Sequence, residues 1–115
     1  MPFDVIVSGI SKVDGEVLFK LEPVWWNAAW LRKDERFKEV DLNQSYYDYI
    51  AELSVDEVRK MHEHFKPVAT EGVYEYDAWQ ERIQPILKEL DEALYQNSDL
   101  YAHFKVHVFE WESGY

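Results

Sequence analysis

The side chains that could bind a metal or transfer a proton near neutral pH are four histidines, which fall into two pairs. His62 and His64 are two residues apart in a segment with helical spacing, whereas helical metal ligands lie three or four residues apart. His103 and His107 belong to a segment that alternates like a β-strand, where four residues span roughly 13 Å. Neither pair can chelate a metal alone, so we expect no metal site and surface or strand-face positions for all four. His103 and His107, beside Lys105, could still change charge between about pH 6 and 7 and modulate a partner surface.

The common residue patterns of catalysis are missing from the sequence. The chain has no cysteine, which excludes disulfides, a thiolate metal site and a thiolate nucleophile. No serine-nucleophile elbow, His-Glu-x-x-His helix, phosphate-binding glycine loop or calcium loop is found. Paired carboxylates such as Glu89 with Asp91, or Asp56 with Glu57, could transfer protons, but adjacent acids on a helix are usually a solvated surface. We therefore expect a binding protein rather than an enzyme, and no cofactor.

Negative charge is the strongest feature of the composition. The 23 acidic and 12 basic residues give a formal net charge of -11. Such a balance repels phosphate backbones and anionic membrane surfaces, and it favours a basic protein partner over nucleic acid or a membrane. The acids are dense between residues 71 and 99, so we expect an anionic face on a helix there, with the candidate binding residues Glu75, Asp77, Glu81, Asp91 and Glu92.

Residues 32–38, in contrast, carry more basic than acidic side chains. The basic side chains of this stretch are Arg32, Lys33, Arg36 and Lys38, against the acids Asp34 and Glu35. An ion-paired, solvated loop explains this run at least as well as an anion-binding site does.

Aromatic residues make up 17% of the chain, more than a core of this size can hold. Tyrosine and tryptophan are the usual anchors of binding surfaces, so some of these rings are candidate interface residues. The alternative is that most of them cover a small core. The candidate aromatic binding residues are Trp25, Trp26, Tyr46, Tyr47 and Trp111.

Four strands are expected from alternating apolar residues, over residues 3–10, 16–22, 46–53 and 100–111. Asp14-Gly15 favours a tight hairpin turn between the first two strands. Straight pairing from that turn would send Val5 and Val7 away from Phe19, so we predict a bulge at Gly9 that brings Val5, Val7, Ile10 and Phe19 to one face.

The segment 100–111 is the clearest strand and the expected centre of the sheet. Its alternation places Leu100, Ala102, Phe104, Val106 and Val108 toward a core and Tyr101, His103, Lys105, His107, Phe109 and Trp111 on the other face. One apolar and one amphipathic face are typical of an antiparallel sheet that is covered on one side. We expect this strand to pair with the first strand, and the free face could join two copies as a homodimer.

Two helices are expected to cover the sheet. Ser54 and Glu57 form a capping box that begins a helix over residues 55–65, which Pro67 should end. A longer helix over residues 77–95 contains Pro85, where we expect a kink or a division into two short helices.

These patterns predict a single α+β domain over residues 1–115, with a mostly antiparallel sheet of about four strands and two main helices on one face. No segment approaches the ~20 apolar residues that cross a bilayer, and we expect a cytoplasmic protein. The first functional hypothesis is an acidic protein-binding module, for instance an immunity protein or inhibitor that neutralises a basic, nuclease-like partner. The alternative is a small-molecule-binding domain or small enzyme with a pocket lined by Trp25, Trp26 and Trp30.

Overall fold

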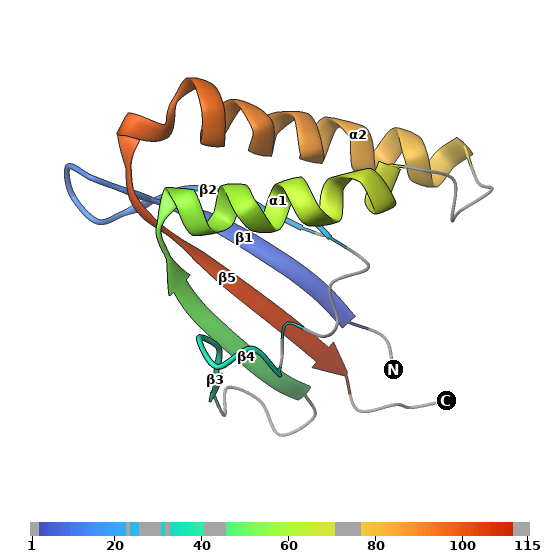
Figure 1. The fold of residues 1–115 in the computed structure, drawn as a ribbon, viewed down its shortest axis with the longest axis horizontal. Coiled ribbons are helices and arrows are strands. Elements are labelled where there is room, and N and C mark those ends of the chain that lie inside the picture. Colours follow the sequence, from blue (N-terminus) through green and yellow to red (C-terminus); the bar gives the residue numbers. More distant parts are fainter. Residues whose placement is uncertain are drawn as a thin grey trace.

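The computed structural model describes residues 3–22, 24–25, 31, 33–40, 46–70 and 77–111. It confirms the α+β class, with one antiparallel sheet and two helices (Figure 1). The strands are β1 (Phe3–Ser11), β2 (Val17–Leu21), β3 (Lys38–Val40), β4 (Tyr46–Leu53) and β5 (Tyr101–Trp111). The helices are α1 (Val55–Thr70) and α2 (Asp77–Asp91), and α2 continues into a π-helical turn (Glu92–Gln96) and a 3-10 turn (Ser98–Leu100). The short strand β3 was not expected from the sequence.

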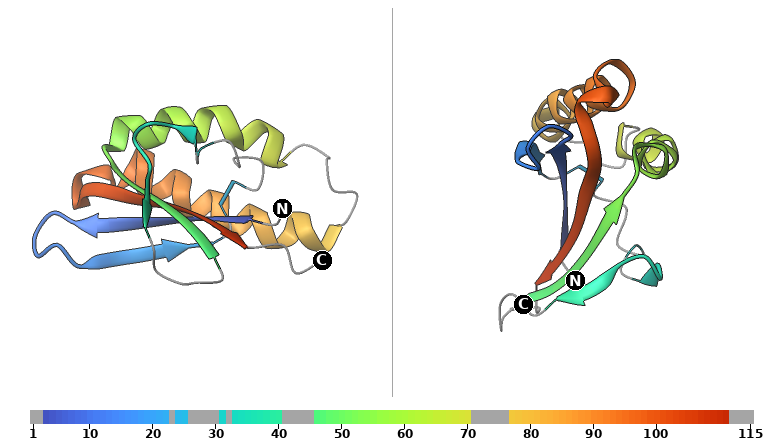
Figure 2. Two further views of the ribbon diagram at one scale, coloured as in Figure 1. Left: turned by 90° about the horizontal axis from the view of Figure 1, so that it is seen from below. Right: turned by 90° about the vertical axis from the view of Figure 1, so that its left-hand side faces the viewer.

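The five strands have the order β2-β1-β5-β4-β3, so β5 is the central strand, as predicted. The predicted pairing of the first and last strands is also confirmed, because Val5 lies opposite Val108 and Val7 opposite Val106 in an antiparallel ladder. The first and last strands therefore lie side by side in the middle of the sheet (Figure 2). The helices α1 and α2 contribute to the same core as these valines and so cover one face of the sheet.

Gly9 makes room for two aromatic rings at the irregular part of the β1–β2 hairpin. The register shifts between Gly9 and Ile10, where a bulge was predicted, but the extra residue is Leu18 of β2 rather than Gly9, because Gly9 lies opposite Phe19 and Ile10 opposite Val17. A Cβ atom on Gly9 would lie 2.3 Å from Cε1 of Phe19 and 2.8 Å from Cε1 of Tyr101, so no other residue fits there without movement. Ile10 does not join Val5, Val7 and Phe19, contrary to the prediction, because the shift places it opposite Val17 and His103 on the other face.

A second irregularity changes the expected faces of β5. Ile10 pairs with His103 but Ser11 pairs with Tyr101, so Ala102 is an extra residue in the ladder. This bulge turns Tyr101 toward the core, where its ring packs edge-on against Phe19 with centroids 5.4 Å apart. The predicted core positions Leu100 and Ala102 are instead exposed. Period-two alternation cannot foresee such a change of phase.

Both helices continue past a proline. The capping box at the start of α1 is confirmed, but the helix ends at Thr70 rather than before Pro67. Likewise α2 is one helix through Pro85, so the division into two short helices is wrong. Each proline deprives one carbonyl, four residues earlier, of its partner. Those carbonyls belong to Glu63 and Glu81, two exposed residues, so water can replace the lost hydrogen bond.

The core lies between the sheet and the two helices. Buried side chains of α1 and α2 recur at helical spacing and meet the inner face of β1, β4 and β5. Arg59 of α1 also donates to the Leu94 carbonyl at 2.8 Å and to Oγ of Ser98 at 3.1 Å, which fixes the end of α2. No helix within the described residues is long and apolar enough to cross a membrane.

Candidate functional site

A pocket of about 530 Å³ lies on the side of α1 that faces the segment before β3. Its described lining comprises Arg36, Glu57, Lys60, Met61, His64 and Phe65. The five α1 residues fall on one helix face because they are three or four positions apart. The volume is within the usual range for small-molecule sites.

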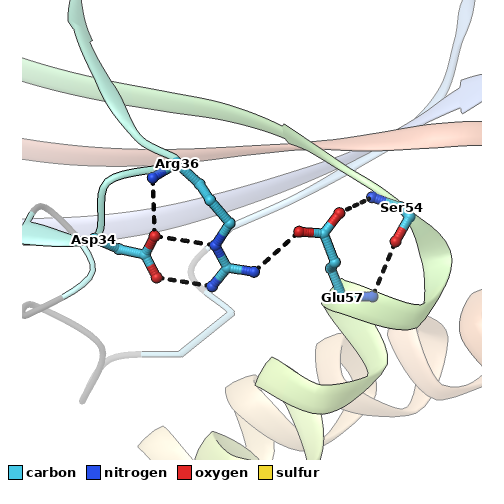
Figure 3. A network of polar contacts seen from close by, with 4 residues as sticks. All are labelled: Asp34, Arg36, Ser54 and Glu57. Atoms are coloured by element: carbon cyan, nitrogen blue, oxygen red, sulfur yellow. Dashed lines mark hydrogen bonds and ion pairs between the residues drawn. The ribbon is translucent and has the colours of Figure 1, made fainter.

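The polar wall of this pocket is a network of fixed hydrogen bonds (Figure 3). Glu57 Oε1 accepts from the Ser54 backbone N–H, and Ser54 Oγ accepts from the Glu57 N–H, both at 3.1 Å. Glu57 Oε2 accepts from Arg36 Nη1 at 3.1 Å. Asp34 accepts two hydrogen bonds from the same guanidinium, from Nε to Oδ1 at 3.0 Å and from Nη2 to Oδ2 at 2.7 Å. The capping box of α1 therefore also positions Arg36.

The charges of this network are held in their ionised forms. The side-chain hydrogen bond to Asp34 raises the pKa of Arg36 above its ordinary value, and the same bond lowers the pKa of Asp34. The hydrogen bond from the Ser54 backbone, followed by that from Arg36, lowers the pKa of Glu57. Both carboxylates are already engaged as acceptors, whereas three of the five N–H groups of Arg36 are used and two are left to donate.

The floor of the pocket is apolar and packs on Trp25. Met61 and Phe65 are buried, and the Phe65 ring packs against Trp25 with centroids 5.6 Å apart. Trp25 is itself completely buried and does not belong to the described lining. It supports the pocket from behind.

Below this floor, His62 links Trp25 to the helix α2. Trp25 Nε1 donates to His62 Nδ1 at 3.0 Å, and since an indole nitrogen can only donate, the proton of a neutral His62 is on Nε2. That Nε2 lies 2.7 Å from Asp91 Oδ1, and Asp91 Oδ2 accepts from Lys66. Burial lowers the pKa of His62, although Asp91 opposes the shift. Burial tends to raise the pKa of Asp91, but the hydrogen bonds from Lys66 and His62 outweigh it and the pKa is lowered.

The described members of the predicted acidic face lie in different surroundings. Asp91 faces His62 and Lys66, Glu81 is exposed on α2, and Glu92 is half-buried in the π-helical turn. Asp77 is the first residue of α2, and its side chain is not among those described. Glu75 lies outside the described residues.

Of the predicted aromatic residues, Trp25 is in the core. Tyr46 of β4 lies opposite Trp111 of β5 in the ladder, and Tyr47 is the next residue on β4. The side chains of these three residues are not among those described, and Trp26 and Trp30 lie outside the described residues.

Two features of the site had a signal in the sequence. The basic run of residues 32–38 was open to an anion-binding interpretation, and Arg36 does line the pocket. His62 is buried, so its expected surface position is wrong. It lies four residues after Val58 and next to Met61, inside the apolar stripe of α1, and that spacing could have revealed its burial.

Within the described ranges, no group of three histidine, cysteine, aspartate or glutamate side chains could hold a metal ion. His107 and Asp48 form a second histidine–aspartate pair, partly buried, on the opposite face of the sheet. No protein-family model, curated protein or solved structure matches this chain.

Proposed function

We propose that the protein is a small-molecule-binding domain whose pocket takes an organic anion with an apolar body. The observation that carries this proposal is the combination of a fixed guanidinium with an apolar floor in one pocket. Arg36 is held by Asp34 and Glu57, and Met61 and Phe65 form the opposing surface. A ring or short alkyl group would lie on the floor while its carboxylate, sulfonate or phosphate meets the cations.

The lining favours an anion because its carboxylate already accepts hydrogen bonds within the protein, whereas its cations have donors that no described residue uses. Both oxygens of Glu57 already accept hydrogen bonds within the protein. Lys60 is exposed at the rim and forms no ion pair with any described residue. Together with the two remaining donors of Arg36, it offers charge-assisted hydrogen bonds to an oxyanion.

The fluorescent probe 8-anilinonaphthalene-1-sulfonate tests this function, since it combines an aromatic body with one sulfonate. We expect one saturable site, with affinity reduced about five- to tenfold in Lys60→Glu, because one charge-assisted contact becomes repulsive. Lys88→Glu is the matched control, as Lys88 is an exposed lysine near the end of α2 and outside the pocket lining. Equal affinities of the two variants would contradict the proposal.

A second candidate function is the binding of a basic protein, and one observation favours it. The β1–β2 hairpin and the turn from α2 into β5 lie at the same end of the molecule (Figures 1 and 2). These segments carry the exposed large apolar side chains of the described residues, which are Val13, Val17, Leu18, Tyr95 and Leu100. The backbone N–H of Lys12 donates to the Leu100 carbonyl at 3.0 Å and joins the two segments. Exposed acids lie beside them in the sequence at Asp14, Glu16 and Asp99. An immunity protein or inhibitor would use such a surface, whereas the homodimer through the free sheet face stays a prediction from the sequence.

This second function is tested by retention of a basic protein on the immobilised chain. The double variant Leu18→Ser with Leu100→Ser should lose a partner that the wild type retains at about 50 mM salt and releases near 300 mM, where charges are more strongly screened. Val40→Ser, on the edge strand β3, is the matched apolar control. Equal retention by both variants would remove the hairpin end from consideration.

A further inference from the structure

A second hollow, of about 200 Å³, lies on the face of the sheet that the helices leave uncovered. Its described lining comes from β1, β2 and β5 and consists of Ile6, Ser8, Val17, Lys20, Lys105 and His107. No acidic residue belongs to this lining, although acids outnumber bases almost two to one in the whole chain. The described lining of the hollow is therefore positively charged, although the protein carries a net negative charge.

The two lysines are brought together by strand register. Ser8 of β1 lies directly opposite Lys20 on one side and Lys105 on the other. Because neighbouring strands are about 4.8 Å apart, the two lysine backbones lie roughly 10 Å apart, with the serine between them. Side chains in register on one face of a sheet are within reach of one another, so the two ammonium groups can converge above Ser8.

None of these three side chains is engaged elsewhere within the described residues. Lys20 and Lys105 form no ion pair there, even though Glu52 of β4 lies opposite Lys105. Ser8 is 8% exposed, and its hydroxyl has no hydrogen-bond partner among the described residues. Two ammonium groups and a sheltered hydroxyl are thus available as donors.

His107 is held at the edge of the hollow by a buried acid. Its Nε2 lies 2.6 Å from Oδ1 of Asp48, which is 2% exposed. Because Nε2 is engaged by the carboxyl group of Asp48, Nδ1 is the remaining polar atom of the ring. Asp48 belongs to β4, on the far side of β5 from the hollow, and its Oδ2 is buried without a partner. The acid orients the ring and does not enter the hollow.

We propose that this hollow binds a phosphate-type oxyanion between Lys20 and Lys105, with the Ser8 hydroxyl donating from below. A tetrahedral oxyanion fits the volume, and its negative charge offsets the repulsion between the two lysines on the strands that flank β1. The ligand is inorganic phosphate or the phosphate group of a small monoester, because both present the same oxygens. The site lies on the opposite face of the sheet from the proposed organic-anion pocket and shares no residue with it, so it does not depend on that function.

The test is a titration of the isotope-labelled protein, followed by backbone amide NMR at constant ionic strength and pH. With inorganic phosphate we expect saturable shifts at residues 8, 20, 105 and 107, and with chloride none. Lys20→Gln and Lys105→Gln should each weaken binding at least about fivefold, as each removes one charged donor. Lys88→Gln is the matched control on α2, and Ser8→Ala should weaken binding less than either lysine variant.

A second titration with glycerol 3-phosphate separates the two sources of the phosphate group. Tighter binding than inorganic phosphate identifies a monoester, and weaker binding identifies the free ion. Shifts that are spread over surface lysines, or that persist unchanged in Lys20→Gln and Lys105→Gln, would overturn the proposal. The amide spectrum of each variant also shows whether it is folded, and both lysines are exposed, so folding should be retained.

Discussion

At the scale of single residues, Gly9 is a position where any side chain would overlap its neighbours. Phe19 and Tyr101 occupy the space that any side chain at this position would fill. We expect Gly9→Ala to reduce the free energy of unfolding by about 1–3 kcal/mol, the usual effect of forcing an extra carbon into a packed site. Denaturant unfolding followed by tryptophan fluorescence measures this change.

The control for Gly9→Ala is a substitution that makes the neighbouring side chain of Phe19 smaller. Phe19→Leu removes the ring atoms nearest to the new carbon, so the double variant Gly9→Ala with Phe19→Leu should be more stable than the sum of the two single effects predicts. Strict additivity, or a loss below about 0.5 kcal/mol in Gly9→Ala, would show that the two rings do not require a glycine.

His62 predicts how stability depends on pH. Burial lowers its folded-state pKa below the ordinary 6.5, so between the two values the unfolded chain binds more protons. The contribution of His62 is complete above pH 6.5 and is lost as the pH falls below that value, with a slope of at most about 1.4 kcal/mol per pH unit. His62→Gln should flatten the decline in unfolding free energy between about pH 7 and 5.

Glutamine suits this test because its amide can accept from Trp25 and donate to Asp91 without titrating. The matched control is His64→Gln, which replaces an exposed histidine two residues away on the same helix. If the two variants show the same pH dependence as the wild type, the buried histidine has no part in the acid sensitivity of the fold.

At the scale of elements, local patterns predicted what local forces determine. The four long strands, the hairpin turn and the start of α1 were recognisable because alternation, Asp14-Gly15 and the capping box each act within a few residues. The three-residue strand β3 has no such pattern, and its formation depends on pairing with β4. The bulge at Ala102 accompanies the packing of Tyr101 on Phe19, a contact between distant segments that local alternation does not encode.

The start of α1 has two roles that a substitution can separate. Ser54→Ala removes the hydroxyl that caps the helix and should cost about 1 kcal/mol of unfolding free energy. Arg36→Gln instead removes the two ion pairs of Arg36, with Asp34 and Glu57, and pairs near the surface contribute about 0–1 kcal/mol each. Thermal and denaturant unfolding should therefore rank Ser54→Ala as the less stable variant, whereas probe binding should fall more in Arg36→Gln. The reverse ranking in both assays would mean that the guanidinium is structural.

At the scale of the whole molecule, the sequence indicated some residues of the site but not that they lie close together in space. The pocket joins Arg36 to a helix face that begins 21 residues later, and the layer below it joins Trp25 to His62 over 37 residues. No periodicity links such distant positions, because tertiary packing alone brings them together. The excess of acidic residues did not predict where a binding site would lie. Asp91 forms an ion pair with Lys66, and cationic side chains line both hollows.

The most direct measurement of the central claim uses the methionines, of which the chain has two, Met1 and Met61. With ¹³C-labelled methionine methyl groups, the Met61 methyl reports on the pocket, because Met61 belongs to its described floor. Binding of 8-anilinonaphthalene-1-sulfonate should shift the Met61 methyl signal and produce nuclear Overhauser contacts from this methyl to the naphthalene ring, and Lys60→Glu should need about five- to tenfold more probe for the same shift. Saturable binding of the probe that leaves the Met61 methyl signal unmoved would place the ligand elsewhere and contradict the account.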